Sequence, residues 1–284
     1  METKPRTQGE RLRDWAWLCR FRLRARWERR FGVPAALDSA GISLPEGLAG
    51  KSLPKRIWIY WQQGWSEAPE IVQRCRRSWE ERNPGWEVVA LDAVSAAAWS
   101  PASEDVAWRD MRRNHQANFL RLDLLAAHGG VWVDATTFCG VPLDAWLPAL
   151  TGTGFFAFAR PGKDRLLSTW FLAAAPGNPL LLAWRAHCRR YARMTARADF
   201  YFWFPYLFAD LCRGDPAVRL VWKTTPKVSA DPSHAVQWSI SRPDRAGVLA
   251  CRIAADAILV HKLDWRLELP PASAATPLAL LLRS

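Results

Sequence analysis

The chain has 284 residues, and half of them are hydrophobic, which is ample for a core and excludes a wholly disordered protein. Its formal net charge of +12 is uneven, because residues 1–31 hold ten Lys or Arg and four Asp or Glu, a net of 10 − 4 = +6. A basic balance suits phosphate-bearing partners, such as nucleic acid, anionic lipid or a sugar nucleotide, and does not choose among them.

The six cysteines are scattered, with no CxxC pair and no cluster at metal spacing, which predicts reduced thiols in a cytoplasmic protein without structural zinc. We expect no signal peptide and no membrane span, because no apolar run approaches the roughly 20 residues that a span needs. Eighteen tryptophans suit carbohydrate stacking or a membrane interface as well as a core.

Residues 11–31 predict a basic amphipathic helix. Apolar residues recur along it mostly four apart, and arginines fill most other positions: Leu12, Trp15, Cys19, Leu23, Trp27 and Phe31. This composition suits a segment lying on an anionic membrane surface, and it equally suits a helix packed on the domain with a solvated arginine face. The predicted organisation is therefore a helix and linker over 1–52, a folded domain over 53–269 and a Pro/Ala/Leu-rich tail over 270–284.

The domain begins with a strand over 57–61, a helix to about residue 82 and a strand over 86–91. Strand, helix and strand within about 35 residues form a βαβ unit, which implies a parallel sheet and an α/β fold. Further along the chain, strands are predicted at 155–158 and 258–263, and helices at 180–191 and 200–212.

The most informative stretch is 118–136. Asn118 and Arg121 share a helical face, two glycines provide a turn, and an apolar strand delivers Asp134 at its end. Ligands of open α/β sheets collect beyond the carboxyl ends of the strands, so Asp134 is a site candidate. A buried Arg121–Asp134 ion pair that only fixes the helix to the sheet is the alternative.

Several motifs, in order and spacing, resemble the capsular polysaccharide synthesis protein family, which belongs with the glycosyltransferase family 32-like, D-x-D-type sugar transferases. They lie at residues 54–64, 68–69, 78–79, 83–86, 129–136, 168–171, 199–208 and 261–263. The resemblance implies a GT-A-type nucleotide-binding fold and transfer of a sugar, with retention, from a nucleotide-sugar donor.

The resemblance also assigns site residues. Asn118 stands at the first acid of a D-x-x-R element and Arg121 at its arginine. Asp134 matches the first D-x-D aspartate, and Thr136 stands where the second, metal-binding aspartate would be. Asp134 and Arg121 are the predicted catalytic pair, and an Asp-Ala-Thr version is usual in the capsular branch.

Two sources of positive charge for the departing diphosphate remain open. The family context favours a divalent cation, Mn²⁺ or Mg²⁺, held through Asp134, although one carboxylate is few for a hard cation. Alternatively, Arg121, His261 and Lys262 neutralise the diphosphate without metal.

We expect the nucleotide base to stack at the end of the first strand, near Trp58, Tyr60 or Trp61. The aromatic block at 199–208 is expected to be mostly core, with Tyr201 or Trp203 as the candidate for an acceptor cleft. Asp123 is expected to be a surface or capping acid.

The implied acceptor is a growing capsular or lipopolysaccharide-type glycan, free or lipid-linked, at the cytoplasmic face of the inner membrane. The alternative is a catalytically degenerate scaffold on the same fold that binds glycan or nucleotide. Nucleic acid is not an expected partner, because no recognised motif interleaves the basic residues.

Overall fold

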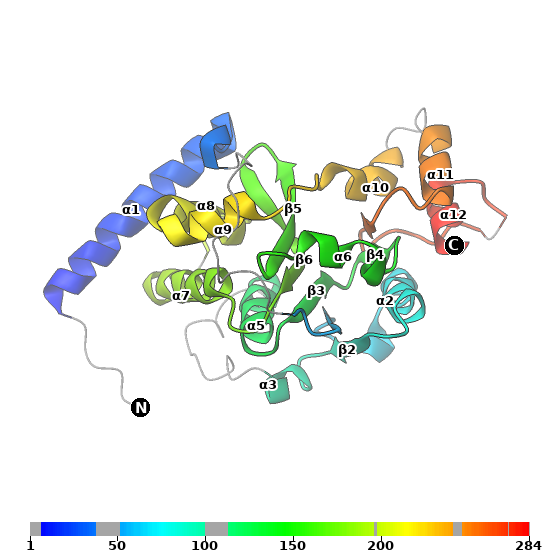
Figure 1. The fold of residues 1–284 in the computed structure, drawn as a ribbon, viewed down its shortest axis with the longest axis horizontal. Helices are drawn as coiled ribbons and strands as arrows, with labels where there is room; N and C mark the ends of the chain where they lie inside the picture. Colours follow the sequence, from blue (N-terminus) through cyan, green and yellow to red (C-terminus); the bar gives the residue numbers. More distant parts are fainter. Residues whose placement is uncertain are drawn as a thin grey trace.

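The computed structural model describes residues 7–37, 52–99, 113–195, 198–240, 246–271 and 273–283 (Figure 1). Its longer elements, in chain order, are α1 (Gln8–Phe31), β1 (Arg56–Tyr60), α2 (Glu70–Arg82), β2 (Glu87–Leu91), α5 (Arg113–His128), β3 (Gly130–Asp134), β5 (Phe155–Gly162), β6 (Arg165–Ala174), α7 (Pro179–Met194), α8 (Trp203–Gly214), α9 (Pro216–Thr224) and α11 (Ala246–Ala254). The short ones are η1 (Ala35–Leu37), η2 (Trp65–Glu67), α3 (Ala96–Trp99), β4 (Thr137–Cys139), η4 (Leu143–Ala145), α6 (Leu147–Leu150), η5 (Asp231–His234), α10 (Ala235–Ser239), β7 (Val260–Lys262) and α12 (Pro277–Arg283).

The central sheet has five strands in the order β2-β1-β3-β6-β5. β1 pairs in parallel with β2 and β3, whereas β6 pairs antiparallel with both β3 and β5. Only β6 is therefore reversed, and the predicted α/β class with a mostly parallel sheet is confirmed. The carboxyl ends of β1, β2 and β3 meet at one edge, where ligands collect in such sheets.

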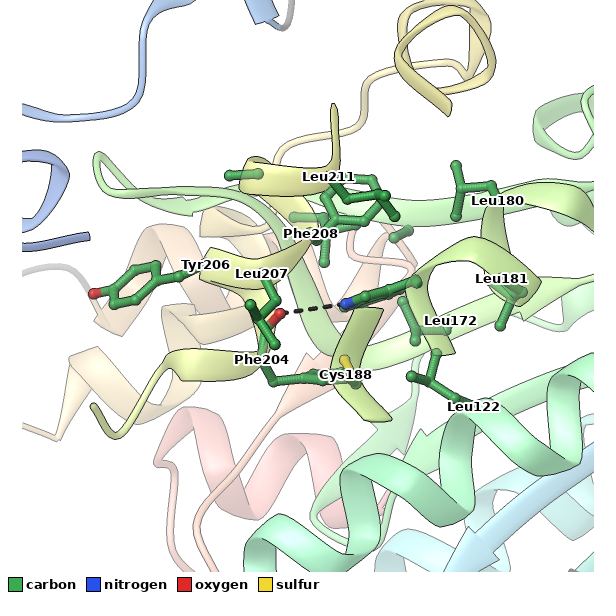
Figure 2. Packing of buried hydrophobic residues seen from close by; sticks show 14 of the residues in the cluster. Leu122, Leu172, Leu180, Leu181, Cys188, Phe204, Tyr206, Leu207, Phe208 and Leu211 are labelled. Carbon is green, nitrogen blue, oxygen red and sulfur yellow. Dashed lines mark hydrogen bonds between the residues drawn. The ribbon is translucent and has the colours of Figure 1, made fainter. Parts of the chain in front are cut away.

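Side chains of β1 and β3 alternate between two core layers, as the two-residue period of a strand requires. Trp58 and Trp132 face the layer formed with α5, α7 and α8, whereas Ile57 and Val131 face the layer formed with α2 and the C-terminal helices. Figure 2 shows part of the first layer, where residues of α5, β6, α7 and α8 interdigitate. Strands β1 and β3 are buried on both faces except at their ends, so polar groups of these strands reach solvent at the edge of the sheet.

The interior strand β6 is absent from the sequence prediction. Its side chains are buried almost throughout, on both faces of the sheet, so the alternation that marks a half-exposed strand is missing. β6 separates β3 from β5, so the predicted strand at 155–158 lies at the sheet edge.

The first and last helices that the structure describes, α1 and α12, both pack onto the rest of the fold. The predicted N-terminal helix is present as α1 and lies against α7 and α8 (Figure 1). Of the predicted linker, residues 32–37 continue along the domain, and Val33 N–H donates to Lys163 O at 2.9 Å. Residues 38–51 lie outside the described residues. The predicted tail ends in α12, which packs on α11.

No helix within the described ranges combines the length and apolarity that crossing a membrane requires.

Candidate functional site

Two glycines connect α5 to β3 and set the geometry of the site. Gly129 and Gly130 have φ angles of +67° and +97°, which side-chain-bearing residues rarely adopt. A Cβ on Gly130 would lie 2.5 Å from the carbonyl oxygen of Arg56 in β1. The glycine pair therefore lets the chain leave the helix and pair directly with β1.

Asp134, at the end of β3, meets the polar face of α5. Arg121 Nη2 donates to Asp134 Oδ1 at 2.7 Å, and Arg121 Nη1 donates to Asn118 Oδ1 at 2.7 Å. Trp132 Nε1 donates to the same Asp134 oxygen at 3.0 Å. The structure thus brings together Asn118, Arg121 and Asp134, as the sequence predicts.

The two partners of this ion pair differ in exposure. The Arg121 side chain is 5% exposed and that of Asp134 is 31% exposed. Asp134 Oδ2 accepts no hydrogen bond from any residue that the structure describes. The pair therefore does fix α5 to the sheet, yet it also leaves one carboxylate oxygen free at the sheet edge.

Arg121 is held by aromatic rings as well as by charge. Its guanidinium carbon lies 4.9 Å from the ring centroid of Trp132 and 5.6 Å from that of Phe204. Burial lowers the pKa of Arg121, and the charge of Asp134 opposes that shift. Arg121 Nε has no hydrogen-bond partner among the described residues. The side chain is fixed in place before any ligand arrives.

A second cation reaches the site from β7. Lys262 Nζ donates to Thr136 Oγ1, and it also donates to Leu263 O at 3.1 Å. Burial lowers the pKa of Lys262, and the nearby carboxylate of Asp134 opposes that shift. Thr136 and Lys262, both predicted site residues, are therefore in contact beside Asp134.

His261 does not reach this site, although the sequence analysis places it beside Lys262 there. Neighbouring residues of a strand point to opposite faces, so His261 points into the core and packs edge-on against the Phe138 ring. Burial, with the nearby Arg82, lowers its pKa to about 3. A role for His261 in neutralising the diphosphate is incompatible with this placement.

The three aromatic residues predicted to stack on a base differ in placement. Trp58 is completely buried, and its Nε1 donates to Gly129 O at 2.8 Å, so it has no free face for a base. Tyr60 and Trp61 are partly exposed at the end of β1, and Tyr60 lies beside the Trp132 ring. For Tyr60 and Trp61, stacking stays a prediction.

A cleft of about 500 Å³ opens at Asp134. Its lining from the predicted set comprises Asn118, Arg121, Asp134, Lys262 and Tyr201. The sequence analysis did not identify the rest, chiefly His115, Arg165, Ser168, Trp170, Phe202, Phe204, His234, Gln237, Trp238 and Asp264. Ser168, Trp170, Phe202 and Phe204 fall within the motifs at 168–171 and 199–208, but no site role was predicted for them. The others come from segments distant in the chain, so no local pattern marks them.

Two other sequence assignments change. Trp203 is completely buried, as expected for most of its aromatic block, and does not line the cleft, whereas Tyr201 is largely exposed and does line it. Asp123 is buried and paired with Arg189 at 3.2 Å and Arg185 at 3.5 Å, both on α7, so it is not a surface acid. The two arginines are four residues apart on α7, whereas Asp123 lies on α5. The residues around Asp123 in the sequence therefore do not reveal this pairing between two helices.

The residues at this site do not fit a divalent cation. Within the described part of the chain, no three His, Cys, Asp or Glu side chains cluster as metal ligands would. Asp134 Oδ1 already accepts two hydrogen bonds, and Asp264 is engaged by Arg266. Thr136, at the place of a second acid, meets the Lys262 ammonium, which would repel a metal.

Several curated fungal proteins are similar to part of this chain. The O-glycosyltransferase braB of Annulohypoxylon truncatum is 28% identical over 151 residues, which are 46% of this chain and 36% of that protein. The O-glycosyltransferase PaGT of Phomopsis amygdali is 28% identical over 138 residues, covering 42% of this chain and 34% of that protein. The putative glycosyltransferase HOC1 of Saccharomyces cerevisiae is 27% identical, covering 45% and 37% respectively.

The chain thus spans about a third of the length of the curated relatives it matches. The chain is also similar to a solved structure, PaToxG Glycosyltransferase, with 14% identity and a TM-score of 0.40 over 58% of this chain and 72% of that one. The profile of the capsular polysaccharide synthesis proteins matches residues 48–278, which include the whole cleft and all of the predicted domain at 53–269. The chain belongs to the capsular polysaccharide synthesis protein family.

Proposed function

We propose that this chain is a glycosyltransferase that moves a sugar from a nucleotide-sugar donor to a glycan acceptor. The observation that carries the proposal is the carboxylate of Asp134, fixed by Arg121 at the carboxyl edge of parallel strands and open to a cleft that also holds Lys262. The glycosyltransferase names of the fungal relatives support the same activity.

In this proposal the donor diphosphate lies across the strand ends beside Asp134. The bond between the anomeric carbon and the donor phosphate oxygen breaks, and an acceptor hydroxyl oxygen bonds to that carbon on the same face. The acceptor proton passes to the departing phosphate, so no protein base is needed and none is assigned. Retention is what the family resemblance implies.

We infer that Lys262 and Arg121, rather than Mn²⁺ or Mg²⁺, supply positive charge to the departing diphosphate. Both cations are largely buried, and fixed charges act strongly where water is excluded. Transfer that persists in EDTA is the expected result. Transfer that is lost in EDTA and restored by Mn²⁺ would overturn this part of the proposal.

The exposed aromatic residues at the rim of the cleft indicate which class of acceptor the enzyme binds. Tyr201, Phe202 and Trp238 line the cleft and are exposed, and such flat amphipathic rings suit stacking on sugars. Together with the family description, this supports a capsular or lipopolysaccharide-type glycan as acceptor. We propose that the reaction takes place at the cytoplasmic face of the bacterial inner membrane.

The first test is a thermal-shift screen with UDP-, GDP- and CMP-sugars on the wild type, Asp134→Asn and Asp144→Asn. Asp144 is a matched control: it also accepts from a cation, Lys55 at 2.7 Å, and from a tryptophan, Trp86 Nε1 at 3.0 Å, but it lies outside the cleft. One nucleotide should raise the melting temperature of the wild type and of Asp144→Asn, because ligand binding to the native state stabilises it.

Asp134→Asn should show no such shift and no transfer. A scaffold that only binds nucleotide would show the same rise in melting temperature but would not turn over the donor. Hydrolysis of the stabilising donor, even if slow, would therefore indicate a transferase rather than a scaffold. A folded Asp134→Asn variant that still transfers sugar would overturn the assignment.

A further inference from the structure

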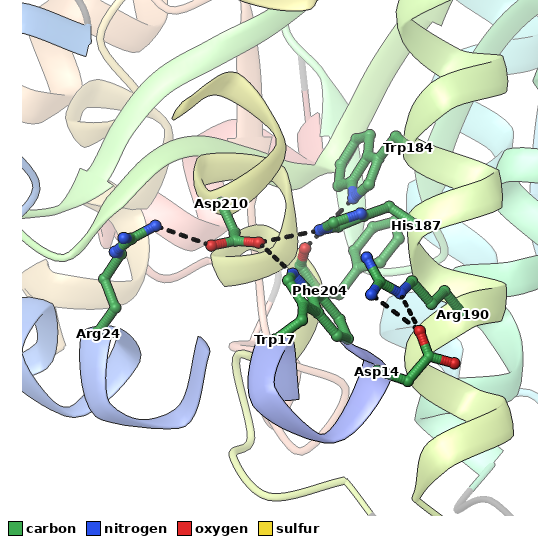
Figure 3. Close-up of polar contacts among 8 residues, drawn as sticks. All are labelled: Asp14, Trp17, Arg24, Trp184, His187, Arg190, Phe204 and Asp210. Atoms are coloured by element: carbon green, nitrogen blue, oxygen red, sulfur yellow. Dashed lines mark hydrogen bonds and ion pairs between the residues drawn. The ribbon is translucent and has the colours of Figure 1, made fainter. Parts of the chain in front are cut away.

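Helix α1 is docked through one face. Trp17, Phe21 and Ala25 are buried against α7 and α8. Figure 3 shows Asp210 of α8 accepting hydrogen bonds from Trp17 Nε1 at 2.9 Å and from Arg24 Nη1 at 3.1 Å. These contacts fix which way the helix faces.

The opposite face carries large apolar side chains interspersed with arginines, and no residue that the structure describes covers it. Five of the six residues that define the sequence stripe are more than half exposed: Leu12, Trp15, Leu23, Trp27 and Phe31. At 100° per residue they lie together on the side away from Phe21, and the rings of Trp27 and Phe31 are 5.2 Å apart. Single exposed apolar residues are ordinary, but a continuous stripe of this kind marks an interaction surface.

The acidic residues of α1 lie toward the docked face, whereas the outer face carries arginines that are unpaired within the described residues. Its three acids are engaged: Glu10 closes the N-terminal capping box, Asp14 pairs with Arg190 at 2.8 Å, and buried Glu28 contacts Arg213. The helix also contains eight arginines. Exposed side chains without a partner among the described residues include Arg11, Arg13, Arg20 and Arg26. The free charge of the outer surface is therefore positive.

A groove of about 490 Å³ joins the arginines to the apolar stripe. Arg20, Arg24 and Arg213 line it together with Leu23 and Trp27, and Glu28 and Pro34 complete its wall. Arg213 is largely buried, and burial together with the charge of Arg24 lowers its pKa to about 10. Cations beside exposed indole and leucine side chains suit a phosphate headgroup whose acyl chains lie along the stripe.

We propose that this outer face of α1 docks on an anionic lipid membrane. The helix would lie in the plane of the interface, with Trp15, Trp27 and Phe31 inserted at headgroup level and the flanking arginines contacting lipid phosphates. A nucleic-acid partner would use the arginines but leave the apolar stripe without a role. The inference goes beyond sugar transfer and does not depend on it.

The test is co-sedimentation of the full chain with phosphatidylcholine vesicles, with and without phosphatidylglycerol. Binding should require phosphatidylglycerol and weaken with added salt, because surface charge is screened. Trp27→Ser should weaken binding on the order of tenfold. Its control is Trp265→Ser, a tryptophan 50% exposed against 52% for Trp27.

Arg20→Gln and Arg26→Gln should each weaken binding about fivefold, as expected for one basic residue near an anionic surface. Arg252→Gln, an exposed arginine on α11, is the control and should leave binding unchanged. Donor hydrolysis should be the same in all these variants, so failure of membrane binding and failure of sugar transfer are read separately.

Three results would overturn the proposal. The first is equal binding to neutral and anionic vesicles, and the second is equal binding by the α1 variants and their controls. The third is a wild type that stays with the supernatant and self-associates through the same residues, which would make the stripe an interface between copies of this chain.

Discussion

Lys262 donates a hydrogen bond from its ammonium group to the hydroxyl of Thr136, where β7 pairs with β4. This contact holds the Lys262 ammonium beside the carboxylate of Asp134. The pairing of two distant segments, rather than any local motif, creates this arrangement.

Replacing Lys262 by Met should reduce turnover about 100- to 1,000-fold, because a preorganised charge at the departing diphosphate is lost. The fold should persist, and Lys55→Met, an exposed lysine outside the cleft, should leave turnover unchanged. Steady-state kinetics of donor hydrolysis measure both. Equal turnover in the two variants would remove Lys262 from the mechanism.

Lys262 should also limit the activity at alkaline pH. Burial puts the pKa of Lys262 below the ordinary 10.5, so the ammonium is charged below its lowered pKa and is lost as pH rises through it. Activity should therefore fall at a lower pH than an ordinary lysine would cause. Lys262→Arg keeps the charge, and its pH–rate profile should lack this alkaline limb.

Arg121→Met should lower the free energy of unfolding by about 2–4 kcal/mol, because it breaks a pair whose arginine is buried while its acid is partly solvated. Arg74→Met, which removes an exposed pair with Glu70 one turn away, should cost about 0.5 kcal/mol or less. Urea unfolding compares the two. Similar losses would contradict a special role for the buried pair.

Gly130→Ala should destabilise the fold by about 1–3 kcal/mol, because a φ of +97° and the close carbonyl of Arg56 both exclude a side chain. Gly85→Ala provides the control, since a Cβ there meets nothing within 4 Å. Thermal and urea unfolding should separate the variants. Equal stability would mean that the α5–β3 turn is not constrained as described.

Substitutions at the cleft rim should change the binding of the acceptor and leave the reaction of the donor unchanged. Tyr201→Ala and Trp238→Ala should each raise the acceptor KM about 3- to 10-fold through lost stacking, with donor hydrolysis unchanged. Trp265→Ala removes an exposed tryptophan outside the cleft lining and should change neither quantity. A raised donor KM in the rim variants would instead assign the rim to the nucleotide.

His261 should make the protein acid-sensitive. Its pKa is about 3 when folded and about 6.5 when exposed, so between these values only the unfolded chain is protonated. Stability from this group is therefore full above pH 6.5 and falls with pH by up to about 1.4 kcal/mol per unit. His261→Leu should show a shallower acid dependence and keep transfer; an unchanged slope would contradict the burial.

Much of the fold was predictable because apolar periodicity reports burial. The βαβ unit from β1 to β2, the helix carrying Arg121 and the strand ending at Asp134 follow from such patterns. Strand β6 could not be predicted from the sequence, because a strand buried on both faces has no alternation of apolar and polar residues to detect. His261 was misplaced for a related reason: adjacency in sequence suggests a shared site, but a strand sends neighbours to opposite faces.

The sequence by itself determined the chemistry: the α/β class, the Asn118–Arg121–Asp134 group, and an arginine-rich helix with an apolar stripe. Patterns of neighbouring residues suffice for these, because the helix and the segment 118–134 are each continuous in the chain and the α/β class follows from the order of strands and helices. Only the tertiary structure decided that Lys262 meets Thr136, that Tyr201 and Trp238 share a cleft, and that the stripe of α1 faces outward. Such contacts depend on how distant segments pack, since the core that joins them is formed by the whole chain.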